Sequence, residues 1–72
     1  MKRHSIFVRD LSKGEASRPQ LLAYDIQDSE DARSLVLGIA KSYSDHGQRP
    51  GTDVHWFRHE GIVHEIYIWS HA

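Results

Sequence analysis

The 72-residue sequence contains no cysteine and only two prolines. Without cysteine, a disulfide scaffold, a thiolate zinc site and a cysteine nucleophile are all excluded. A chain of this length buries only about 60% of its unfolded surface, so it can form one core but not two. With 39% hydrophobic and 26% charged residues, the composition is that of a folded protein. We therefore expect one small domain that spans residues 1–72.

The sequence also lacks an excess of charge of either sign. Nine Lys and Arg stand against ten Asp and Glu, which gives a formal net charge of −1. This argues against general nucleic-acid binding, because such binding needs clustered basic side chains. An alternative function remains open, namely nucleic-acid or anionic-ligand binding through the basic N-terminal segment. Its residues are Lys2, Arg3, Arg9, Lys13 and Arg18.

Long apolar runs are missing as well. Near the N-terminus only Ile6, Phe7 and Val8 are consecutive apolar residues before Arg9, whereas a signal peptide has about 7 to 15. No window approaches the roughly 18 apolar residues of a membrane span. We expect a soluble intracellular protein of the cytoplasm that has no membrane partner.

Four segments have the pattern of regular structure. Residues 5–11 and 21–26 are short runs with β-branched or alternating apolar residues, as in strands. Residues 29–46 have helical periodicity, and residues 53–69 indicate a β-hairpin centred on residues 59–61. This order predicts an α+β fold of the two-layer ββαββ type. One helix would pack on a mostly antiparallel sheet of about four strands.

The predicted helix is the clearest element. Asp28 is a good N-cap, and Gly47 offers a left-handed residue after the last turn. The apolar residues recur at helical spacing and form one stripe, with Leu35 and Ile39 at its centre. The stripe consists of Ala32, Leu35, Val36, Ile39, Ala40 and Tyr43.

Two registers are open for the predicted hairpin. A two-residue turn at residues 60–61 would place His59 opposite Ile62 and would mix apolar with charged residues on each face. A three-residue loop that includes His59 instead pairs Arg58 with Ile62 and gathers the aliphatic residues on one face. We favour the second register, because a slip of one residue moves every side chain to the other face.

The favoured register leaves one sheet face without a covering helix. It places His55 opposite Glu65 and puts a largely aromatic patch on the uncovered face. Exposed apolar patches of this kind mark interaction surfaces. We therefore expect a small non-catalytic binding module that self-associates as a homodimer or binds a protein partner. The binding residues would be Phe57, Val63, Tyr67 and Trp69.

Histidine is the one residue type that raises the question of a metal. His55, His59 and His64 lie within ten positions, and the two-residue turn would bring all three to one face. Two residues four apart on a strand are about 13 Å apart, however, whereas zinc holds imidazole nitrogens at about 2.0 Å. We expect surface or paired histidines and no metal, with metal binding by these three residues as a second alternative.

Catalytic motifs are absent from the sequence. It has no glycine-rich phosphate loop, no His-Glu-x-x-His helix and no Gly-x-Ser-x-Gly elbow. One helix on one sheet also rarely encloses the roughly 300 Å³ that a substrate pocket needs. The sequence therefore favours a protein that is not an enzyme and that uses no cofactor.

Overall fold

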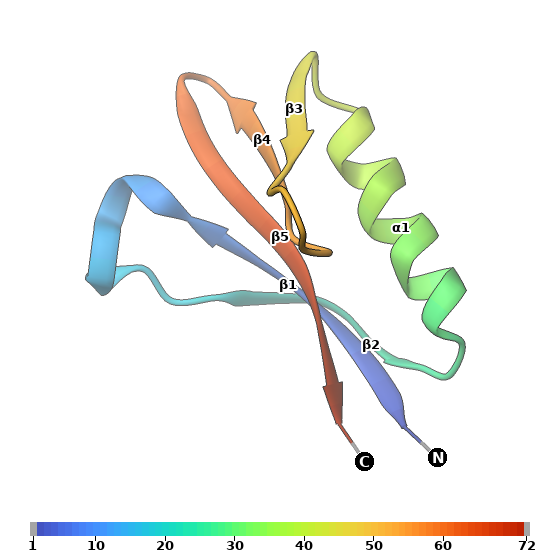
Figure 1. The fold of residues 1–72 in the computed structure, drawn as a ribbon. Helices are drawn as coiled ribbons and strands as arrows, with labels where there is room; N and C mark the ends of the chain where they lie inside the picture. Colours follow the sequence, from blue (N-terminus) through green and yellow to red (C-terminus); the bar gives the residue numbers. More distant parts are fainter. Residues whose placement is uncertain (1, 72) are drawn as a thin grey trace.

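The computed structural model describes residues 2–71, apart from the side chains of residues 15 and 16. In this part of the chain, one α-helix and a short 3₁₀ helix accompany five strands (Figure 1). In chain order the elements are β1 (Arg3–Asp10), η1 (Leu11–Ala16), β2 (Gln20–Ile26), α1 (Ser29–Lys41), β3 (Asp45–Gln48), β4 (His55–His59) and β5 (Ile62–His71).

The five strands form one antiparallel sheet in the order β2-β1-β5-β4-β3. The first and last strands are neighbours, with Arg3 opposite His71, so the two ends of the described chain lie close together in Figure 1. Helix α1 lies on one side of this sheet. The predicted α+β fold, with one helix on a mostly antiparallel sheet, is thus confirmed. The sheet has five strands where about four were expected.

Strand β3 is the additional strand. Its sequence, Asp45-His46-Gly47-Gln48, has neither the alternation nor the β-branched residues that indicate a strand. The strand forms because its backbone pairs with β4, with His46 opposite Phe57 and Gly47 opposite Trp56. Tertiary pairing therefore overrides weak local preference in this segment.

Helix α1 begins where expected and ends earlier than expected. The Asp28 carboxylate accepts a hydrogen bond of 2.8 Å from the Glu30 amide, which confirms the N-cap. The helix stops at Lys41, and Ser42 is the C-cap residue. The prediction that Gly47 ends the helix is wrong, because Gly47 belongs to β3.

The face that α1 buries is narrower than the predicted stripe. Ala32, Val36 and Ala40 are fully buried, and Ile39 packs against them at the side. These three residues are spaced by four, so they form a single row along the helix. Leu35 is 42% exposed. The stripe is therefore centred on Val36, and the prediction that Leu35 lies at its centre is wrong.

The hairpin of β4 and β5 adopts the register that the sequence argument disfavoured. His59 lies opposite Ile62, and Phe57 lies opposite His64. Between the strands Glu60 and Gly61 both have positive φ, 53° and 79°, as a two-residue type I′ turn requires. The tight turn matches the twist of the strands, so it fixes a register that the apolar pattern alone does not favour.

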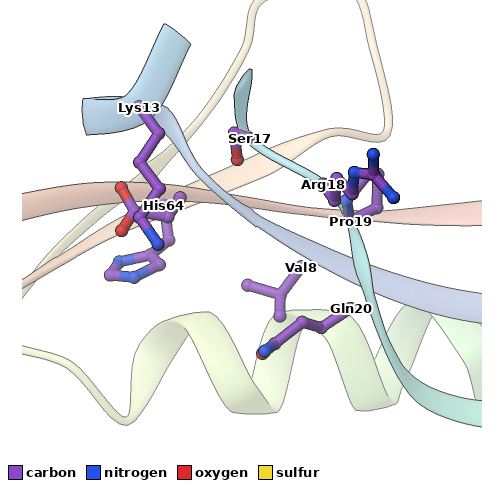
Figure 2. A pocket seen from close by; sticks show the side chains of 8 residues that line it. Val8, Lys13, Ser17, Arg18, Pro19, Gln20 and His64 are labelled. Carbon is purple, nitrogen blue, oxygen red and sulfur yellow. The ribbon is translucent and has the colours of Figure 1, made fainter. Parts of the chain in front are cut away.

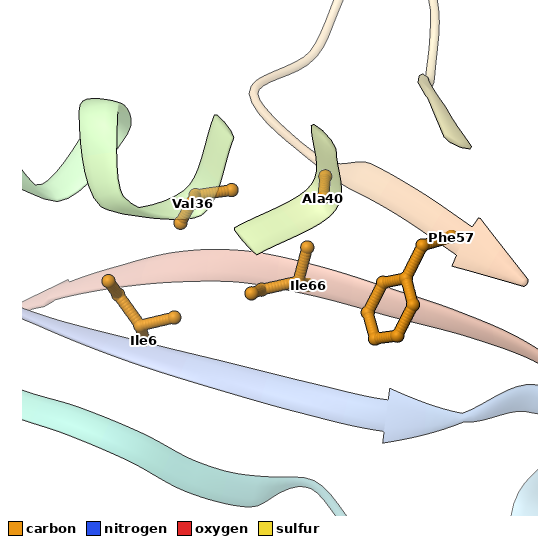
Figure 3. Packing of buried hydrophobic residues seen from close by; sticks show 5 residues of the cluster. All are labelled: Ile6, Val36, Ala40, Phe57 and Ile66. Carbon is orange, nitrogen blue, oxygen red and sulfur yellow. The ribbon is translucent and has the colours of Figure 1, made fainter. Parts of the chain in front are cut away.

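The register places Phe57 in the core. Figure 3 shows Ile6, Ile66 and Phe57 on the sheet facing Val36 and Ala40 on α1. Phe57 is only 5% exposed. Its ring stacks on the Tyr43 ring at 4.0 Å on one side and on the His64 ring at 5.0 Å on the other. The core is small. Within the described part of the chain, its buried apolar residues are Ile6, Ala32, Val36, Ala40, Phe57 and Ile66.

Candidate functional site

The face of the sheet turned away from α1 carries a group of large apolar side chains, and we call it the open face. Strand pairing defines it, because residues directly opposite each other share a face. Phe7 lies opposite Tyr67 on the neighbouring strand, and both are only half-buried. Trp69 is 58% exposed. The large apolar residues of the open face are Phe7, Leu21, Trp56, Val63, Tyr67 and Trp69.

The aromatic rings of the open face contact each other across β1 and β5. The Phe7 ring stacks on the Tyr67 ring with a centroid distance of 5.9 Å, and it meets the Trp69 ring at 6.1 Å and 58°. Trp56 lies apart, over the backbone of Gly47. A Cβ at position 47 would be 2.7 Å from the indole Nε1, so only glycine leaves room for this indole.

Charged side chains adjoin the aromatic rings, and they are paired with one another. The Glu65 carboxylate accepts hydrogen bonds from Arg9 at 3.1 Å and from Arg49 at 2.8 Å. Arg58 and Asp45 form an ion pair of 2.8 Å. The Nε of Arg9 is buried and has no hydrogen-bond partner among the described atoms. Ion pairing therefore neutralises most of the arginine charge of this face.

The structure separates the residues predicted to form the binding patch. Val63, Tyr67 and Trp69 lie on the open face, whereas Phe57 lies on the helix side and is buried. The expected pair of His55 with Glu65 is also wrong, because His55 lies opposite Ile66 and Glu65 opposite Trp56. Both errors have one cause, the one-residue difference in hairpin register.

Two aromatic residues of the open face were missed by the sequence argument. Trp56 was not among the predicted binding residues, because the favoured register puts it on the face opposite Tyr67, and Phe7 was not linked to β5. The Glu60-Gly61 dipeptide was the available signal for Trp56, because glycine is preferred at the second position of a type I′ turn. Nothing local in the sequence indicates that β1 and β5 are neighbours.

The three candidate metal ligands share the helix side of the hairpin but do not converge. His64 stacks on Phe57, and the His59 ring meets the Tyr43 ring edge-on at 5.5 Å. His55 contacts backbone, with its Nδ1 3.3 Å from the Asp53 carbonyl oxygen. Among the described side chains, no group of three or more His, Asp or Glu is placed to hold a metal ion.

The five basic N-terminal residues are distributed over the molecule. Arg3 pairs with Asp25 on β2, and Arg9 pairs with Glu65 on the open face. Lys13 and Arg18 line a hollow beside β1 on the helix side (Figure 2), whereas Lys2 lies near the start of α1. They do not form the continuous basic stripe that a nucleic-acid backbone would follow.

Two serine–histidine pairs connect β1 with β5. His4 Nδ1 is 2.7 Å from Ser70 Oγ, and Ser5 Oγ is 3.1 Å from His71 Nε2. Within residues 2–71 neither histidine is hydrogen-bonded to a carboxylate, so neither pair has the third group that orients a catalytic imidazole. The two pairs join the ends of the central strands.

Comparisons of this chain with protein-family models, curated proteins and solved structures find no match. Among residues 2–71, no helix combines the length and the apolar character that crossing a bilayer requires.

Proposed function

We propose that this protein is a non-catalytic binding module that forms a homodimer through the open face of its sheet. The observation that carries the proposal is the position of Phe7, Trp56, Tyr67 and Trp69 on the one face that α1 does not cover. Large exposed aromatic side chains on a sheet are typical of surfaces that another molecule covers. The cytoplasmic location expected from the sequence is part of the same proposal.

The shape of the monomer supports a partner on this face. The chain measures 38 × 26 × 21 Å and exposes 5105 Å². A monomeric protein of 8.3 kDa ordinarily exposes about 4,600 Å². The exposed surface of this chain is thus about 500 Å² larger than that of an ordinary monomer of its mass, as its flat two-layer form requires. Stable interfaces bury about 800 Å² on each partner, which is an area of the same order as one face of this sheet.

The charges of the open face favour a second copy over a nucleic acid. Arg9 and Arg49 share the Glu65 carboxylate, and Arg58 is paired with Asp45. Phosphate binding gains its free energy from basic groups that exchange counterions for phosphates, and groups already paired with carboxylates supply less of it. A two-fold dimer hides the same apolar patch on both chains, because its interface is self-complementary.

The edges of the sheet are poorly suited to pairing with another chain. Edge strand β2 contains two register shifts, and its Asp25 has a positive φ of 62°. Edge strand β3 is only four residues long. Short or bulged edges discourage strand addition. The proposed dimer therefore forms by contact between faces and does not extend the sheet.

Sedimentation velocity tests the proposal over a range from about 1 to 100 µM, a span that covers ordinary dimer affinities. We expect a monomer–dimer equilibrium that added salt leaves unchanged, because an apolar interface is not screened. Trp69→Ser should weaken it about thirtyfold, as loss of an interface anchor does. Leu35→Ala is the matched control, since Leu35 is exposed on the helix side, and it should sediment like the parent. A parent chain that stays monomeric throughout, or a Trp69→Ser variant that dimerises like the parent, would overturn the proposal.

A further inference from the structure

A hollow of about 470 Å³ lies on the helix side of the sheet, away from the open face. It forms where β1 passes into η1 and the chain returns into β2. Its volume is within the range of small-molecule sites, about 300 to 1,000 Å³. The lining residues are Val8, Asp10, Lys13, Ser17, Arg18, Pro19, Gln20 and His64.

One side of the hollow is built for an anion. Ser17 and Arg18 follow one another along the segment that leads into β2. Ser17 and Arg18 supply a hydroxyl and a guanidinium, both of which donate hydrogen bonds, whereas the Gln20 side chain lies beside Val8 in Figure 2. Arg18 forms no ion pair with another described side chain. A guanidinium in this setting binds phosphate through two parallel hydrogen bonds.

The other side of the hollow has mixed polarity. In Figure 2, Lys13 extends from η1 toward His64, on the side opposite Arg18. Asp10 Oδ1 accepts hydrogen bonds from the Ser12 hydroxyl at 2.6 Å and from the Ser12 amide at 2.8 Å. These bonds lower the pKa of the Asp10 carboxyl. A carboxylate acceptor beside an ammonium donor suits hydroxyl groups, which both donate and accept.

We propose that this hollow binds a small hydroxylated organic phosphate of the sugar-phosphate class. The phosphate lies against Ser17 and Arg18, and the hydroxylated body lies against Asp10 and Lys13. Val8 and Pro19 supply the apolar contacts of the wall. Among the lining residues whose side chains the structure describes, Lys13 and Arg18 are positive and Asp10 is negative, a net charge of +1 without counting His64.

NMR titration of the full chain with glucose 6-phosphate, inorganic phosphate and glucose tests the proposal at constant ionic strength. We expect saturable amide shifts confined to the residues that line the hollow. Glucose 6-phosphate should bind at least about tenfold more tightly than inorganic phosphate, because it also contacts the second side of the hollow. Equal affinity for the two probes would overturn the assignment of the hydroxylated body. Shifts that spread over every Lys and Arg would overturn the site as a whole.

Two substitutions test the contribution of each side of the hollow to binding. Arg18→Gln should weaken both phosphate probes about tenfold, as loss of a charge-assisted hydrogen bond does. Lys13→Gln should weaken glucose 6-phosphate and leave inorganic phosphate nearly unchanged. Lys41→Gln, an exposed lysine in the last turn of α1, is the matched control and should bind like the parent. Parental affinity in Arg18→Gln, with a parental spectrum showing that it folds, would refute the proposal.

The test of the hollow is independent of the proposed dimer. Trp69 lies on the open face, whereas the hollow is on the helix side. Trp69→Ser should therefore bind glucose 6-phosphate like the parent while it loses self-association. Each proposal can fail without the other.

Discussion

Replacement of Phe57 by alanine tests the hairpin register. Phe57 is 5% exposed and lies between the rings of Tyr43 and His64. Truncating a buried phenylalanine to alanine costs about 3 to 5 kcal/mol, and each aromatic pair lost adds to this cost. A 72-residue domain has a total free energy of unfolding of about 4 to 11 kcal/mol. We therefore expect Phe57→Ala to lose most of the stability of the fold.

Thermal unfolding followed by circular dichroism measures this loss. The midpoint should fall by about 12 to 40 °C, or the variant should be unfolded at 25 °C. Leu35→Ala removes an apolar side chain that is 42% exposed and should cost no more than about 1.5 kcal/mol. Both variants are measured at one protein concentration, because dimerisation would add to the apparent stability. A Phe57→Ala midpoint equal to that of Leu35→Ala would mean that Phe57 does not lie in the core, and the register would be refuted.

The remaining predictions concern two glycines and the loss of stability at acidic pH. In urea unfolding, Gly47→Ala should lower stability by about 1 to 3 kcal/mol, because the new Cβ would lie 2.7 to 2.9 Å from atoms of the Trp56 indole. Gly38→Ala should raise stability by up to about 1 kcal/mol, because its Cβ would meet no atom within 4 Å. The Asp10 pKa is lowered by its bonds to Ser12, so its stabilising effect is complete above the unfolded-state pKa and is lost as pH falls through the lower folded value. Carboxyl NMR titration should show the Asp10 pKa returning toward its ordinary value in Ser12→Ala, and an unchanged pKa would disprove the assigned cause.

Local signals in the sequence determined the kinds of element and the order of most of them. Asp28 begins the helix because its carboxylate caps a backbone amide, an interaction that reaches only two residues along the chain. The strands around residues 5–11 and 21–26 were predicted from their apolar pattern, which reflects the two-residue period of a strand. The α+β class followed from this order, since one helix and several strands have few ways to bury their apolar sides.

Only the tertiary structure decided which side chains face the helix and which remain on the open face. The type I′ turn at residues 60–61 sets the register of β4 and β5, and that choice moves Phe57 into the core and Trp56 out of it. Strand β3 exists through its pairing with β4, and Phe7 joins Tyr67 because the two ends of the chain are neighbours in the sheet. The pairing of β1 with β5 links residues about 60 positions apart, so its free energy is set by the packed fold and leaves little trace in any short segment.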